Sequence, residues 1–219
     1  MPYEFDVTTD LGPRWLDWCW IAGRLLLLNH QTVTAHCCQN SPTARWSMRY
    51  IELRRHTDND GDRLSEKGVA DAEAIGRADL HPPYALFVST GAERATEMLR
   101  ILRRAAGQEE APIITETALQ SAVEDRWRDA AKAAGKGASL EDIRTVDPDL
   151  VEHESRLLGA ALQGILEALP DEGRALIVGH SPTNEAAACG LTGQTVAPLG
   201  KGEGIVIVED GGRYAVRLP

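Results

Sequence analysis

Cysteine, aromatic residues and long apolar runs are all scarce in this sequence. Four of the 219 residues are cysteines, and phenylalanine, tryptophan and tyrosine together make up 5%. The cysteines are Cys19, Cys37, Cys38 and Cys189. The adjacent pair lies near His30 and His36, but the spacing matches no common zinc motif and no second pair follows. We therefore expect free thiols in a reducing compartment, with neither a bound metal nor another cofactor.

Long apolar runs and an excess of positive charge are also lacking. No run approaches the ~18 apolar residues that a membrane-spanning helix requires. The 33 acidic residues outnumber the 23 basic ones and give a net charge of -10, which argues against nucleic acid or a membrane as a partner. The start of the chain carries Glu4, Asp6 and Asp10 where a secretory signal would be basic. These absences predict a soluble, cytoplasmic protein in which any anion site is local.

The composition changes near Met48. Residues 1–47 hold four of the five tryptophans and three of the four cysteines, with little helical or strand periodicity. The tryptophans are Trp15, Trp18, Trp20 and Trp46. We predict that residues 1–47 are an extension outside the fold and that residues 48–219 form the functional domain. The alternative is that the extension is a docking segment that buries its tryptophans.

After Met48, apolar strand patterns alternate with helical ones. Strands are expected at 48–55, 84–90, 112–116 and 174–180, with a terminal hairpin over 204–218. Helices are expected at 64–80, 91–106, 148–169 and 181–190, with Ser65, Asp147 and Ser181 as the N-caps of the first, third and last. The longest should begin after Asp147 with Pro148 in its first turn and should bury Leu150, Leu157, Ala161, Ile165 and Leu169. This alternation predicts an α/β three-layer sandwich, a mostly parallel sheet with helices on both faces.

Three strand-to-helix junctions carry residues that could bind an anion. Arg55 and His56 lie at the end of the first strand, Arg94 lies in the first turn of the helix after the second, and His180 ends the strand 174–180. Any one of these alone is more often a structural histidine or a solvated arginine. Because the carboxyl ends of parallel strands meet at one edge of a sheet, together they predict a phosphate site.

The stretches LRRHT, DRLSEKG, VSTGAERATEM and VGHSPT resemble the histidine phosphatase superfamily, which has the phosphoglycerate mutase-like fold. The resemblance spans residues 48–218. It implies that His56 is a nucleophile that is transiently phosphorylated. It also implies that Arg55, Arg94 and His180 hold the phosphoryl oxygens without a metal, with Arg63 and Ser89 as further substrate-binding candidates.

The sequence departs from the family pattern at three points. Thr57 stands where glycine is usual, and Arg54 replaces an apolar residue; we expect Arg54 to pair with a carboxylate on a neighbouring strand rather than with substrate. The general acid is the least defined position. Alignment of Leu119 and Trp127 puts Ser121 where a glutamate is usual, so Glu124 is the candidate acid, with Asp125 as the alternative.

These features predict a metal-independent phosphatase. It would hydrolyse a phosphomonoester or phosphohistidine on a small molecule or a phosphoprotein. The compact length and the weakly defined acid favour the short phosphohistidine phosphatase branch, because an imidazole leaving group needs less protonation than an alkoxide. Two alternatives remain: an inactive phosphate-binding or protein-binding module, and a phosphoglycerate mutase-type phosphotransferase.

Overall fold

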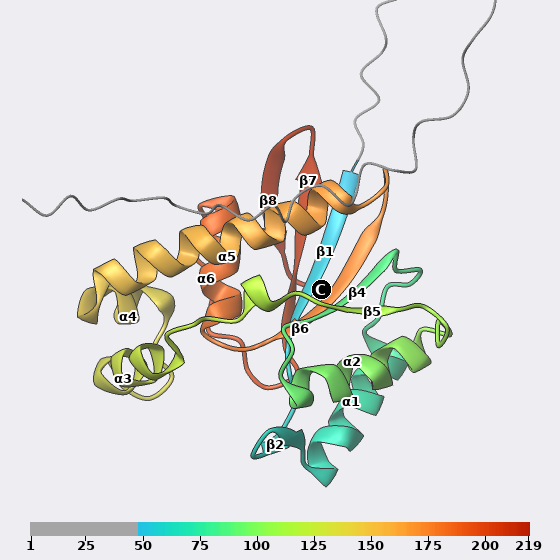
Figure 1. The fold of residues 1–219 in the computed structure, drawn as a ribbon, viewed down its shortest axis with the longest axis horizontal. Helices are drawn as coiled ribbons and strands as arrows, with labels where there is room; N and C mark the ends of the chain where they lie inside the picture. Colours follow the sequence, from blue (N-terminus) through green and yellow to red (C-terminus); the bar gives the residue numbers. More distant parts are fainter. Residues whose placement is uncertain (1–47) are drawn as a thin grey trace, which may run out of the picture. The chain divides into compact units, whose positions relative to one another are not determined.

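The computed structural model describes residues 48–219, and these form a layered α/β unit (Figure 1). The predictions for residues 1–47, including the role of the extension and the state of three cysteines, lie outside the described residues. Within the described part, six strands form one sheet in the order β5-β4-β6-β1-β7-β8, and β2 and β3 form a separate small hairpin.

The main elements alternate as the sequence predicts. The strands are β1 (Met48–Arg55), β2 (Asn59–Asp60), β3 (Arg63–Leu64), β4 (Leu86–Ser89), β5 (Ile113–Thr115), β6 (Arg174–Gly179), β7 (Gly204–Asp210) and β8 (Arg213–Arg217). The helices are α1 (Glu66–Ala78), α2 (Glu93–Ala105), a short 3-10 helix η1 (Thr117–Leu119), α3 (Glu124–Ala134), α4 (Leu140–Val146), α5 (Pro148–Ala168) and α6 (Thr183–Thr192).

The sheet is mostly parallel. β1 pairs with β6, β6 with β4, and β4 with β5, all in parallel, whereas β7 is antiparallel to both β1 and β8. The predicted three-layer class is therefore confirmed. Because β1, β6 and β4 are adjacent, their carboxyl ends lie side by side, and these are the strands that precede His56, His180 and Arg94.

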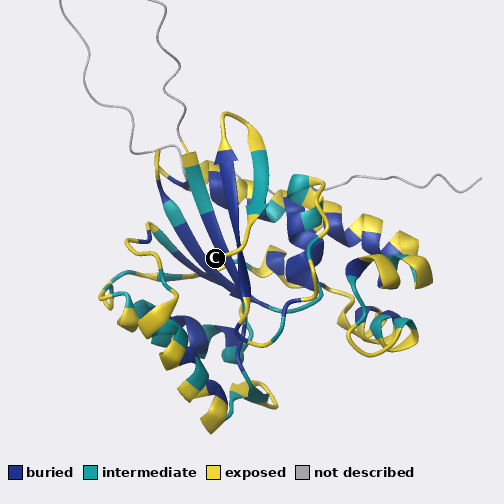
Figure 2. Ribbon diagram, turned by 180° about the vertical axis from the view of Figure 1, so that it is seen from behind, coloured by how far each residue is buried: buried dark blue, intermediate teal, exposed yellow. Residues whose placement is uncertain are grey.

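Apolar cores form on both faces of the sheet (Figures 1 and 2). On one face α5 and α6 pack over Ile51, Leu53 and Ile177, with α3 and α4 contributing to the same cluster. On the other face α1 and α2 pack over Phe87 and Val178. Successive residues of a strand point to opposite faces, so β4 and β6 each supply residues to both clusters.

Side-chain caps mark the starts of α1 and α5. Ser65 caps α1 by accepting the Gly68 N–H, and Asp147 caps α5 by accepting the Leu150 N–H, as predicted. The Ser181 cap is wrong, because α6 begins at Thr183 and the Ser181 hydroxyl donates to Glu185 instead.

The predicted buried stripe of α5 is wrong in part. Leu157 is 50% exposed, whereas its neighbour Leu158 is 2% exposed and packs in the core with Leu162. The face turned inward is the one that contacts α6. There a Cβ on Gly159 would lie 2.5 Å from the backbone of Gly190, so the two helices approach closely.

Two helices lie where no periodic pattern indicates them. α3 buries Trp127 and Ala130, and α4 begins with a capping box formed by Ser139 and Asp142. Both lie between β5 and α5, beside the carboxyl ends of the central strands (Figure 1). No helix within residues 48–219 is long and apolar enough to cross a membrane.

Candidate active site

The carboxyl ends of β1, β4 and β6 border a cavity of about 340 Å³. His56, Arg94 and His180 line its inner end, and residues from the β5 to α3 segment line its outer wall. The backbone N–H of His56 donates to the carbonyl of Gly179 at 3.0 Å, which ties the end of β1 to the end of β6. Three of the four predicted phosphate-binding residues therefore meet at one cavity.

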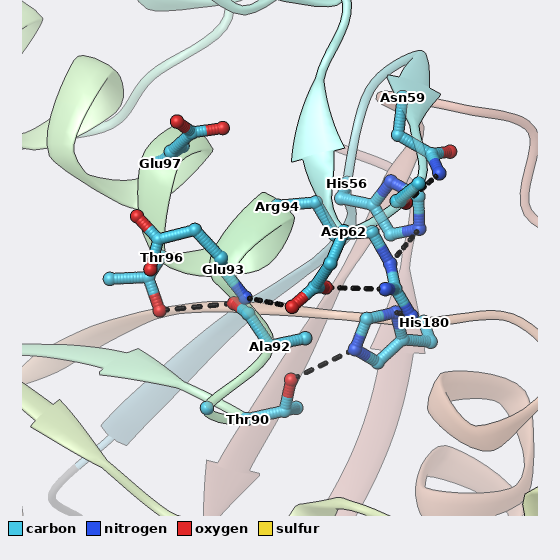
Figure 3. Close-up of polar contacts among 12 residues, drawn as sticks. His56, Asn59, Asp62, Thr90, Ala92, Glu93, Arg94, Thr96, Glu97 and His180 are labelled. Carbon is cyan, nitrogen blue, oxygen red and sulfur yellow. Dashed lines mark hydrogen bonds and ion pairs between the residues drawn. The ribbon is translucent and has the colours of Figure 1, made fainter.

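His56 is buried, and its ring orientation is fixed by the next residue. Nδ1 lies 2.7 Å from the carbonyl oxygen of Thr57, which can only accept, so Nδ1 carries the proton. Nε2 therefore carries a lone pair, and Nε of Arg94 donates to it at 3.3 Å (Figure 3). The unprotonated nitrogen, the one able to act as a nucleophile, faces the arginine.

His180 lies beside His56, with ring centroids 5.1 Å apart. Its Nδ1 is 3.4 Å from Nη2 of Arg94, and its Nε2 is 3.0 Å from the hydroxyl of Thr90. Because an arginine can only donate, Nδ1 is the acceptor and Nε2 carries the proton.

Both histidines are neutral at neutral pH. Burial lowers the pKa of His56 to about 4, the Thr57 carbonyl raises it, and the charge of Arg94 lowers it further. Burial and then Arg94 lower the pKa of His180 to about 3. Desolvation disfavours the charged imidazolium, so the site keeps two lone pairs available beside a permanent positive charge.

Arg94 uses three nitrogens at once (Figure 3). Nε and Nη2 point to the two histidines, and Nη1 lies 2.6 Å from Oδ1 of Asp62. Asp62 is in the turn between β2 and β3, and sequence reasoning assigned it no role in the site. Asp62 ends the DGD stretch, which indicates a turn, and begins the DRLSEKG stretch, but neither pattern indicates a partner for its carboxylate.

Arg55 is not among the residues that line the cavity. Its Nη1 donates to the carbonyl of Leu199 at 2.6 Å. The backbone N–H of Leu199 donates to the Glu185 carboxylate at 2.8 Å. Glu185 is 2% exposed and also accepts from Ser181, and burial raises its pKa. Arg55 and Glu185 thus hold Leu199, in the loop between α6 and β7, through its carbonyl and its N–H.

Two further candidates lie outside the cavity lining. Ser89 is fully buried; its hydroxyl is 2.8 Å from that of Thr96 and accepts the Gly91 N–H, so it braces the loop that precedes α2. Arg63 is exposed and donates to Glu97 at 3.2 Å. The geometry therefore brings neither Ser89 nor Arg63 to the cavity.

The outer wall of the cavity contains Glu124, the candidate acid, and Ser121, at the position where a glutamate is usual. Asp125, the alternative acid, is not among the lining residues and accepts a hydrogen bond from Arg128. Ser121 is buried and Glu124 is exposed at the first residue of α3, and both line the cavity with Trp127 and Arg128. Glu124 accepts a hydrogen bond from Gln120 at 3.1 Å. Its carboxylate is the acidic group on this wall.

The two departures next to His56 have structural roles. Thr57 is fully buried, and its hydroxyl donates to the carbonyl of Gly68 at 2.8 Å. Arg54 is 3% exposed and donates to Glu52 at 2.6 Å, so its expected carboxylate partner lies on the same strand rather than on a neighbouring one.

Binding of a metal ion requires a group of side chains that can ligate it. Among residues 48–219, no three His, Cys, Asp or Glu side chains come together in a group that could hold an ion.

Comparison with known proteins gives matches at the level of structure. No family model and no curated protein matches the sequence. Phosphoglycerate mutase from Bacillus anthracis superimposes with a TM-score of 0.60 at 20% identity, over 80% of this chain and 93% of that one. YhfR of Bacillus stearothermophilus gives 0.53 at 20% identity, over 78% and 96%. A phosphoserine phosphatase variant from Entamoeba histolytica, in complex with phosphoserine, gives 0.52 at 12% identity, over 77% and 94%. The chain has the phosphoglycerate mutase-like fold.

Proposed function

We propose that this protein is a phosphatase that forms a phosphohistidine intermediate on His56. The observation that carries the proposal is the neutral His56 whose Nε2 lone pair faces Arg94 and lies beside His180 in one cavity. A neutral nucleophile next to a fixed positive charge suits attack on an anionic phosphoryl group, since phosphoryl transfer depends on positioning and charge stabilisation.

In the first step, the Nε2 lone pair of His56 attacks phosphorus and the bond from phosphorus to the leaving group breaks. Nε and Nη2 of Arg94, which now donate to the histidines, would donate to phosphoryl oxygens in the substrate complex. The leaving group departs with the bonding electrons and takes a proton from the acid, for which Glu124 is the candidate.

In the second step, water attacks the phosphohistidine. The bond from phosphorus to Nε2 breaks, and the bond electrons restore the His56 lone pair. Glu124, ionised by the first step, takes the water proton, which returns the site to its starting state and releases inorganic phosphate. The hydrogen bond from Nδ1 to Thr57 keeps the same tautomer through the cycle.

The substrate is a phosphomonoester or phosphohistidine. The structural neighbours include a phosphoglycerate mutase and a phosphoserine phosphatase bound to phosphoserine, so phosphoglycerates and phosphoserine are the first small molecules to test. The fold of the mutase neighbour makes phosphotransfer a second candidate. The short connection from β5 to α5, with its two small helices, favours a phosphatase with an accessible cavity.

The full chain should hydrolyse a chromogenic phosphate ester, and a panel of phosphoserine, 3-phosphoglycerate and phosphohistidine should rank substrates. His56→Ala should abolish turnover. Acid-quenched wild-type protein should carry acid-labile phosphate on His56 by mass spectrometry. His153→Ala is the matched control, because His153 is an exposed histidine of α5.

The possible outcomes separate the three functions. Wild-type turnover in His56→Ala would remove the mechanism. Transfer of phosphate to a second phosphoglycerate position, without release of inorganic phosphate, would identify a mutase. Tight phosphate binding with no turnover on any substrate would identify a binding module.

A further inference from the structure

Asp62 holds Arg94 through the one guanidinium nitrogen that does not contact a histidine. Its Oδ1 is 2.6 Å from Nη1 of Arg94, and its Oδ2 accepts the backbone N–H of Glu93 at 3.4 Å (Figure 3). Glu93 is the first residue of α2, the helix that carries Arg94. The carboxylate therefore fastens both the arginine side chain and the start of its helix.

The contact with Asp62 is the short one of the three. Arg94 reaches the ring nitrogens of His56 and His180 at 3.3 and 3.4 Å, which are long hydrogen bonds to neutral acceptors. The guanidinium is planar, so fixing Nη1 also fixes the direction of the edge that carries Nε and Nη2. The carboxylate thus determines which edge of Arg94 faces the two histidines.

We propose that Asp62 is a positioning residue for phosphoryl binding. It fixes the rotation of the Arg94 guanidinium so that the Nε and Nη2 edge is presented between His56 and His180. This inference rests on the proposed function. An entering phosphoryl group would replace the two neutral ring nitrogens as acceptor and would leave the bond from Nη1 to Asp62 in place.

The alternative is that the Asp62 carboxylate occupies the phosphate position and must leave before substrate binds. Two observations favour positioning. Asp62 accepts from Nη1 of Arg94 rather than from Nε or Nη2, the edge that faces the histidines. It also lies outside the cavity lining. Its side chain is also 61% exposed, so solvent screens its repulsion of a bound phosphate.

The orientation of Arg94 can be measured without substrate. In ¹⁵N-labelled full-length protein, the Arg94 Nε–H signal, assigned by its loss in Arg94→Lys, should be slow to exchange with water. In Asp62→Asn it should broaden or exchange at least several-fold faster, and in Asp62→Glu it should partly recover. Asp60→Asn is the matched control, an exposed aspartate of the same hairpin. An unchanged Arg94 signal in Asp62→Asn would overturn the proposal.

The kinetic arm compares the same variants by turnover of a chromogenic ester and by competitive inhibition with inorganic phosphate. Asp62→Asn should weaken phosphate inhibition and lower kcat/KM by about 10-fold or more, because a misplaced contact is costly in phosphoryl transfer. Its melting temperature should stay near wild type, since an exposed ion pair adds little stability. Asp62→Glu should recover part of the loss, and Asp60→Asn should behave as wild type.

Tighter phosphate inhibition in Asp62→Asn would show that Asp62 competes with phosphate. An equal loss of kcat/KM in Asp60→Asn would show that the effect of Asp62→Asn comes only from the change in net charge. Either result would overturn the proposal. A wild-type protein that hydrolyses no phosphate compound would instead refute the proposed function, and the Arg94 signal would still decide whether Asp62 positions the side chain.

Discussion

Arg55 and Arg94 belong to the same predicted phosphate cluster, yet their guanidinium groups have different partners. Arg94 lines the cavity, whereas Nη1 of Arg55 donates to the Leu199 carbonyl. At the scale of single residues, the side-chain direction therefore decides the role. Arg55 still adds positive potential, since its charge contributes to the lowered pKa values of both histidines.

This difference predicts separable effects of two alanine substitutions. Arg94→Ala should lower kcat/KM by ~100-fold or more, because it removes charge-assisted bonds to the transferring group. Arg55→Ala should lower the free energy of unfolding by about 2 kcal/mol, because it breaks a charge-assisted bond to a largely buried carbonyl. Urea denaturation and steady-state kinetics of both variants test this. If Arg55→Ala kept full stability but lost phosphate inhibition, Arg55 would have to turn into the cavity on binding.

The buried histidines also predict how stability depends on pH. The folded-state pKa of His56 is about 4 and its ordinary value is 6.5, so between these values the unfolded chain binds the proton and the folded protein does not. Stability is therefore greatest above about pH 6.5 and falls as the pH decreases toward 4. At pH 5 this residue should cost roughly 2 kcal/mol relative to pH 7.

Urea denaturation of His56→Gln at both pH values tests the effect. The variant should lose roughly 2 kcal/mol less than wild type between pH 7 and pH 5, while His153→Gln, on the exposed side of α5, should lose as much as wild type. Equal losses in all three proteins would place the pH sensitivity elsewhere.

The meeting of His56, Arg94 and His180 could be predicted from sequence, because the carboxyl ends of adjacent parallel strands share one edge of the sheet. The roles of Arg55 and Asp62 could not be predicted in this way. The partner of Arg55 is Leu199, 144 residues away in a loop, and the partner of Asp62 is Arg94, 32 residues away at the start of α2. No local pattern specifies either contact.

At the scale of elements, features set by local signals could be predicted from sequence, whereas features set by long-range contacts could not. The caps of α1 and α5 involve neighbours three residues apart, so Ser65 and Asp147 could be read directly. The inward face of α5 could not, because Leu157 and Leu158 offer two apolar stripes about 100° apart. Close packing against α6 at Gly159 selects the second stripe.

Gly68 links an element to the site and supplies a test at this scale. A Cβ there would lie 1.9 Å from the backbone oxygen of Asp58, in the loop that follows His56. Gly68→Ala should therefore shift this loop, destabilise the protein by about 1 to 3 kcal/mol and reduce turnover. Gly164→Ala is the control. Gly164 is a helical glycine of α5 with open space around it, so alanine there should stabilise by up to ~1 kcal/mol. Thermal unfolding of both variants tests this prediction. Equal stability changes in the two variants would mean that the Asp58 loop can shift without loss of stability.

At the scale of the whole molecule, residues 48–219 account for both faces of the sheet. β1 begins at Met48 and is hydrogen-bonded on both sides, to β6 and to β7. The apolar clusters that cover the two faces include residues from β1, β4, β6 and β7 and the helices between them. The composition of the chain changes at the same point, and the division between residues 1–47 and 48–219 stays a prediction.

A protein that begins at Met48 should therefore fold and keep its activity. It would contain one tryptophan, Trp127, which is 3% exposed and lines the cavity, so its fluorescence reports on the site without the four tryptophans of residues 1–47. Emission should be blue-shifted in the folded protein and should move to the red in one cooperative urea transition. The melting temperature and the kcat/KM for a chromogenic ester should match those of the full chain. Insolubility, a large drop in melting temperature, or loss of the blue-shifted emission would mean that residues 1–47 bury their tryptophans against the domain and belong to its core.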